Sequence, residues 1–93
     1  MSGNNNARYA YNYLMQRYGL QPHQAAGVVG NLMQESGRNL NTSARNPGDG
    51  RDGSDSIGIA QWNSGRARGL HQFARDRGVD VGNLDLQLDY AMH

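Results

Sequence analysis

The spacing of apolar residues along the chain predicts four helices separated by turns. The segments with apolar side chains at helical spacing are residues 7–18, 22–36, 65–77 and a last stretch from about 84. The first pattern is the strongest, with Asn6 as a plausible N-cap and Gly19 as a stop. Gln21 is a weak cap for the second helix, where Ser, Thr or Asp is preferred, so we expect that helix to be slightly loose at its start. The fold class is therefore mainly α.

Residues 38–56 show no helical period and are rich in glycine, asparagine, aspartate and serine. A loop of this length is usually functional or mobile. Asp49, Asp52 and Asp55 recur at every third position, which suggests a calcium loop, but the EF-hand order of acids, glycine and closing glutamate is absent. We therefore expect a flexible acidic loop and no metal site.

Residues 57–62 (IGIAQW) are β-branched at two positions and bounded by turn formers, so they predict a brief strand or extended segment. This segment carries the chain's single tryptophan, Trp62, beside Gln61. A flat apolar face next to an amide suits a carbohydrate cleft. The alternative, a core tryptophan in a domain short of large side chains, is favoured by composition alone.

Glu35 is the one glutamate in a chain whose other acidic residues are all aspartates. It falls at the edge of the apolar stripe in the last turn of the second helix, just before Gly37. Partial burial and the negative end of the helix dipole both disfavour the charged form of a carboxyl group there. Such a carboxyl suits a general acid. The alternative is a solvated residue near a helix end.

Composition excludes several classes of protein. Ninety-three residues make one small domain, and its net charge is only +1. The basic residues are scattered arginines, and none lies between Arg17 and Arg38, so the first two helices do not form a DNA-binding helix-turn-helix and we expect no nucleic-acid partner. No apolar run approaches the roughly 18 residues of a membrane span. With no cysteine, the chain has no thiolate metal site.

The two ends of the sequence give further expectations. Residues 1–6 lack the charged and apolar regions of a signal peptide. The last helix has no stop signal, and the apolar pattern still continues at His93. We therefore expect residues 1–93 to be a single domain that is the N-terminal part of a longer domain or polypeptide.

Two motifs in this order resemble the phage tail lysozyme family, within the lysozyme and lytic transglycosylase superfamily. Residues 24–37 (QAAGVVGNLMQESG) are similar to the central helix of that family, and residues 57–62 resemble its second signature. The segments between and after these motifs come in the same order as the elements of the family, so the resemblance spans about residues 7–93. It implies a lysozyme-like domain of about four helices, with a small extended or β segment lining a glycan cleft.

The resemblance also implies an activity. This is cleavage of the β-1,4 bond between the alternating sugars of peptidoglycan, by a lysozyme (muramidase) or a lytic transglycosylase, without a cofactor. The protein would belong to the tail of the virion and act in the host cell wall or periplasm. Its partners would be bacterial peptidoglycan and other phage tail proteins, with no membrane partner. The alternative is a non-catalytic lysozyme-like module that has a structural role or binds glycan in a phage tail.

The roles of Glu35, Gln61 and Trp62 follow from the resemblance, and those of Ser36, Asp55 and Asp52 follow from their positions in the sequence. Glu35 carries over as the general acid, while Gln61 and Trp62 carry over to the cleft, with Ser36 beside the acid as a further substrate contact. Asp55, just before the second signature, is the best placed base for a hydrolase. Asp52 is the fallback. If neither reaches the site, a hydroxyl of the substrate closes an anhydro ring and the enzyme is a transglycosylase.

Overall fold

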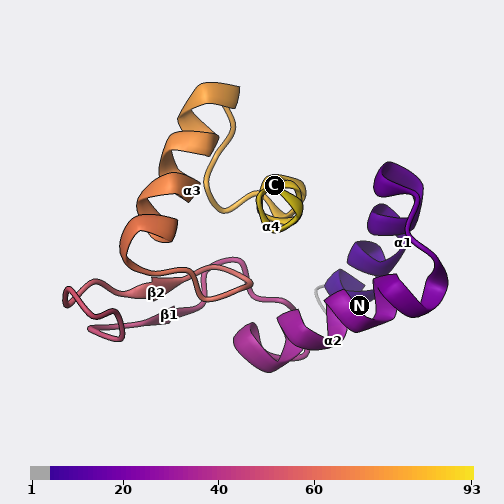
Figure 1. The fold of residues 1–93 in the computed structure, drawn as a ribbon, viewed down its shortest axis with the longest axis horizontal. Coiled ribbons are helices and arrows are strands. Elements are labelled where there is room, and N and C mark those ends of the chain that lie inside the picture. Colours follow the sequence, from indigo (N-terminus) through magenta and orange to yellow (C-terminus); the bar gives the residue numbers. More distant parts are fainter. Residues whose placement is uncertain (1–4) are drawn as a thin grey trace.

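A computed structural model, which describes residues 5–93, shows four helices and a two-stranded antiparallel sheet (Figure 1). The elements are α1 Asn6–Tyr18, α2 Pro22–Ser36, β1 Arg45–Asn46, β2 Ser56–Ile57, α3 Ser64–Arg77 and α4 Leu84–Met92. This confirms the predicted mainly α fold with a small β region. Residues 1–4, which belong to the N-terminal segment without signal-peptide features, lie outside the residues that the structure describes.

The helices pack around one core. Helix α1 packs on α2. Helix α4 contacts both α1 and α3 and lies between them (Figure 1). The largest apolar side chains of the core come from all four helices and from the loops; they include Leu14, Val29, Leu32, Leu40, Ile59, Leu70, Phe73, Leu88 and Tyr90. No helix within residues 5–93 is both long and apolar enough to cross a bilayer.

Most ends of the helices follow local signals in the sequence, but Asn6, the expected N-cap of α1, lies inside that helix, and its N-cap is Asn5. Gly19 adopts the left-handed conformation, with a φ of 66°, and ends α1 as predicted. Gly78, with a φ of 64°, ends α3 in the same way. The expected weakness at Gln21 is wrong, because the Gln24 side chain accepts a hydrogen bond of 2.9 Å from the Gln21 N–H. Helix α4 begins as predicted, since the Asn83 side chain accepts from the N–H of Leu86.

The strand expected over residues 57–62 is largely wrong, because the chain turns back after Ile57. Ile57 and Trp62 exchange two backbone hydrogen bonds of 2.8 Å, so the four residues between them form a tight turn. Gly58 has a φ of +80°, and a Cβ atom there would lie 2.8 Å from Oε1 of Gln87 and 3.0 Å from the Trp62 ring. Only glycine fits this conformation and this space, so the strand ends at Ile57.

Trp62 lies in the core rather than at an open surface. Its side chain is 7% exposed, and its ring meets Tyr90 edge-on with the ring centroids 5.1 Å apart. This is the placement that composition favoured, and little of the ring remains for stacking on a sugar.

Replacing Trp62 with alanine is expected to lower the free energy of unfolding by about 3–5 kcal/mol, the range for large aromatic deletions in a core. Tyr9→Ala provides a control, because Tyr9 is 47% exposed and its loss should cost far less. Denaturant unfolding followed by circular dichroism measures both. Equal, small losses in the two variants would contradict the core placement of Trp62.

Candidate active site

Glu35 lies in the last turn of α2, and its side chain is exposed. The partial burial expected from the sequence is wrong. The buried stripe of α2 runs through Val29 and Leu32 toward Ser36, and Glu35 lies about 100° to one side of it. The Ser36 hydroxyl donates a hydrogen bond of 2.9 Å back to the carbonyl of Leu32. Glu35 therefore meets solvent, and a ligand can reach it there.

A compact connection leads from the end of α2 to the sheet. Two turns close it: the Leu40 N–H donates to the carbonyl of Gly37, and the Ala44 N–H donates to that of Asn41, both at 3.0 Å. Leu40 is fully buried and anchors this connection in the core. The carbonyl of Ala44 then accepts a hydrogen bond of 2.9 Å from the N–H of Gly58. This links the segment after Glu35 directly to the turn at residues 58–61.

Gln61 forms an amide pair with Asn46, a residue that the sequence analysis did not identify. The Asn46 Nδ2 donates to Oε1 of Gln61 at 2.6 Å, while Nε2 of Gln61 donates to the carbonyl of Gly58 at 3.0 Å. Gln61 holds a φ of +54°, a left-handed conformation that is uncommon for a residue with a side chain and that Leu40 and Ser64 also adopt. Asn46 is exposed and Gln61 partly so. The pair offers amide donors and acceptors to a ligand.

Asp52 is held more firmly than a flexible loop would allow. Its carboxylate accepts from the Ser54 N–H at 3.0 Å and the Ser64 hydroxyl at 2.9 Å, and it forms an ion pair with Arg68 at 3.3 Å. Hydrogen bonds from Ser54, then from Ser64 and Arg68, hold the pKa of Asp52 well below its usual range. The expectation of a flexible acidic loop is therefore wrong at Asp52.

Asp55 and Asp49 fix other parts of the same loop. Asp55 accepts from the N–H of Gly48 at 3.0 Å and pairs with Arg45, and these contacts lower its pKa. Asp49 accepts from the hydroxyl of the buried Ser56 at 2.7 Å. The contacts of Asp52 and Asp55 thus stabilise the fold fully at a pH above the usual pKa of an aspartate. This stabilisation is lost as the pH falls through their lowered pKa values. Within residues 5–93, histidine and acidic side chains form no group of three that could hold a metal.

Gln87 on α4 is a second residue that the sequence analysis missed. It is 1% exposed, and its Oε1 accepts from the Ile59 N–H at 2.9 Å. Its Nε2 donates to the carbonyls of Thr42 and Val81, at 3.1 and 2.8 Å. One carboxamide therefore ties together the segment after α2, the turn that carries Gln61 and the α3–α4 loop.

Gln87→Leu is expected to lower the free energy of unfolding by about 2–4 kcal/mol, because it leaves one buried N–H and two carbonyls without partners. Gln16→Leu is the matched control, since Gln16 is exposed on α1. Chemical denaturation measures both variants. A loss in Gln87→Leu no greater than that in Gln16→Leu would show that the three hydrogen bonds contribute little.

Comparison with known proteins identifies the family of the chain. The sequence model of the phage tail lysozyme family matches residues 5–93, which is almost the whole chain and includes both motifs noted in the sequence. No curated protein and no solved structure matches the chain. The chain belongs to the phage tail lysozyme family.

Proposed function

We propose that this protein cleaves the β-1,4 bond between the sugars of peptidoglycan, with Glu35 as the general acid. The observation that carries the proposal is the position of Glu35: the chain's single glutamate is exposed in the last turn of α2, in a member of the phage tail lysozyme family. Glu35 protonates the glycosidic oxygen while positive charge develops on the neighbouring sugar ring.

The substrate contacts in this proposal come from neutral groups. Gln61 and Asn46 offer amides that match the hydroxyl and acetamido groups of the sugars. The Ser36 hydroxyl, whose proton points to the Leu32 carbonyl, still has lone pairs to accept from the substrate. Trp62 is buried and contributes indirectly: its ring packs against Gly58 and supports the turn that carries Gln61.

The second catalytic group decides the type of reaction. In a hydrolase that inverts the anomeric centre, a second carboxylate lies about 6.5–9.5 Å from the acid and activates a water held between them. We propose Asp55 for this role, because Asp52 has more partners and is tied to the start of α3 through Ser64. Asp52 is the fallback. In a lytic transglycosylase neither is needed, and a hydroxyl of the substrate itself closes the ring.

The place of action follows from the same proposal. The protein works as part of the phage tail on the peptidoglycan of the host, in the cell wall or periplasm, next to other tail proteins. Its reaction requires no cofactor.

One observation supports a different function. Glu35 is open to solvent, whereas a general acid gains from a site that excludes water. A module that binds glycan without cutting it would show this arrangement too. Incubation of the protein with purified peptidoglycan, followed by mass spectrometry of the soluble fraction, separates the two functions. Glycan fragments are expected, and binding to the insoluble material without release of fragments would support the non-catalytic module.

A further inference from the structure

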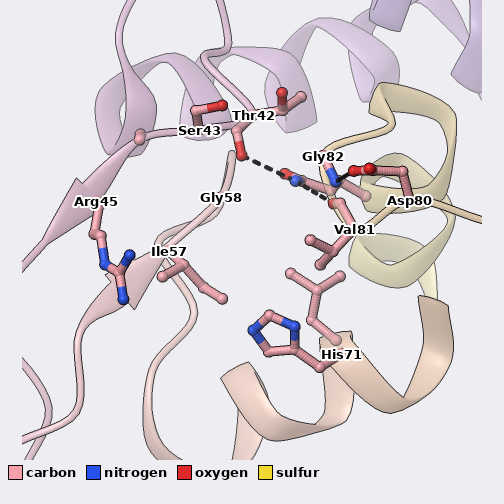
Figure 2. A pocket seen from close by; sticks show the side chains of 12 residues that line it. Thr42, Ser43, Arg45, Ile57, Gly58, His71, Asp80, Val81 and Gly82 are labelled. Atoms are coloured by element: carbon pink, nitrogen blue, oxygen red, sulfur yellow. Dashed lines mark hydrogen bonds between the residues drawn. The ribbon is translucent and has the colours of Figure 1, made fainter. Parts of the chain in front are cut away.

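A pocket of about 330 Å³ lies between the sheet, α3 and the α3–α4 loop (Figure 2). Aliphatic side chains form one part of its wall and charged or polar side chains another. The aliphatic residues are Ile57, Leu70 and Val81; the charged or polar ones at its rim include Arg45, His71 and Asp80. Glu35, Gln61 and Trp62 are not among its lining residues, and its one link to the candidate catalytic groups is Arg45, which pairs with Asp55.

The groups at the rim carry both signs of charge. Arg45 uses its Nε to pair with Asp55, so its two terminal nitrogens are not engaged in that ion pair. The imidazole of His71 is directed into the pocket beside Ile57 (Figure 2). Asp80 lies on the other side, where it accepts a hydrogen bond of 2.7 Å from the N–H of Gly82. A ligand that spans the pocket can thus place a carboxylate near Arg45 and an ammonium near Asp80.

These walls suit a peptide better than a sugar. Protein sites for sugars combine an aromatic face with neutral amides, as the amide pair of Asn46 and Gln61 does in part. Among the described residues that line the pocket, none is tryptophan, tyrosine or phenylalanine. An aliphatic wall between opposite charges instead matches a short peptide that has small apolar groups, a carboxylate and an amine.

We propose that this pocket binds the peptide stem of peptidoglycan, an inference that rests on the proposed function. Arg45 lines the pocket, and its neighbour in β1, Asn46, belongs to the amide pair. Successive side chains of a strand point to opposite faces, and their Cα atoms lie about 3.8 Å apart. A stem of three residues extends over about 10 Å. In this proposal the glycan lies at the amide pair and the stem passes around the edge of β1 into the pocket.

Nuclear magnetic resonance of the wild-type protein tests the proposal with the synthetic tripeptide L-alanyl-γ-D-glutamyl-L-lysine. The tripeptide is expected to shift the His71 ring signals and the methyl signals of Ile57 and Val81. A chitooligosaccharide, which has no peptide, is expected to shift the side-chain amide signals of Asn46 and Gln61 instead. Unchanged pocket signals with the tripeptide would overturn the proposal. It would also fail if the sugar alone shifted those signals, because the pocket would then be part of the glycan site.

A pair of histidine variants gives the second test. His71→Ala is expected to weaken tripeptide binding about three- to tenfold, the effect of losing one hydrogen bond. His23→Ala, an equally exposed change in the first turn of α2, should leave the binding unchanged. Equal affinities in the two variants would contradict a role for His71. Because the tripeptide binds without being cleaved, failure of glycan cleavage would reject the proposed function alone, while cleavage without tripeptide binding would reject only the pocket.

Discussion

Glu35→Gln is expected to slow the release of fragments from peptidoglycan by about 10²–10⁴-fold, the contribution of general acid catalysis. Glutamine has nearly the same shape as glutamate and still forms hydrogen bonds, but it has no proton to transfer to the leaving oxygen. Glu35 is exposed, and within residues 5–93 it has no hydrogen bond or ion pair through its side chain. The free energy of unfolding should therefore change by no more than about 0.5 kcal/mol.

Clearing of a cell-wall suspension measures the rate, and denaturant unfolding measures the stability. Asp76→Asn is the matched control, because it also converts one exposed carboxylate to an amide but lies on α3. The control should clear the suspension as fast as the wild type. If Glu35→Gln clears it equally fast, Glu35 is not the acid. If the variant instead proves strongly unstable, the carboxylate has a structural role that its exposure does not indicate.

The helices could be predicted because their signals are local. Apolar spacing and a glycine stop are both contained within one segment, so α1 ends at Gly19 as expected, and α3 ends at residue 77, the bound that its apolar spacing predicts. The turn at residues 58–61 could not be predicted in this way. Its shape depends on Gln87, which lies 28 residues beyond Ile59 in the sequence. In a helical pattern a glutamine reads as a surface residue, so the burial of Gln87 was missed as well.

In the candidate site, too, local features could be predicted from the sequence and features that depend on distant residues could not. The place of Glu35 at the end of α2 follows from local sequence, whereas its exposure depends on which other elements pack beside that end of the helix. Asn46 was missed because its partner, Gln61, lies 15 residues away across a loop. The register that brings them together, with Asn46 opposite Ser56, is fixed by contacts such as that between Asp49 and Ser56. In the sequence alone, Asp49 is visible only as one of three aspartates that recur at every third position.

Asp55→Asn is expected to reduce the rate almost as much as Glu35→Gln, if Asp55 is the base that activates water. The wild-type products should then carry reducing ends, because water adds to the anomeric carbon. Asparagine retains an oxygen that accepts from the N–H of Gly48, so the loop keeps that contact. The ion pair with Arg45 is lost, but it is exposed and contributes little to stability. The test combines clearing rates with mass spectrometry of the products.

A rate loss in Asp55→Asn has a second explanation, namely a loop displaced by the loss of the Arg45–Asp55 ion pair. Arg45→Gln separates the two, because it breaks the same ion pair and leaves the Asp55 carboxylate in place. If Asp55 acts chemically, Arg45→Gln should retain most of the activity toward glycan strands stripped of their peptides, which avoids any effect on the peptide pocket. An equal loss in both variants would assign Asp55 to holding the loop. Anhydro-sugar ends, together with an unaffected Asp55→Asn, would show that Glu35 works without a second carboxylate and that the enzyme is a lytic transglycosylase.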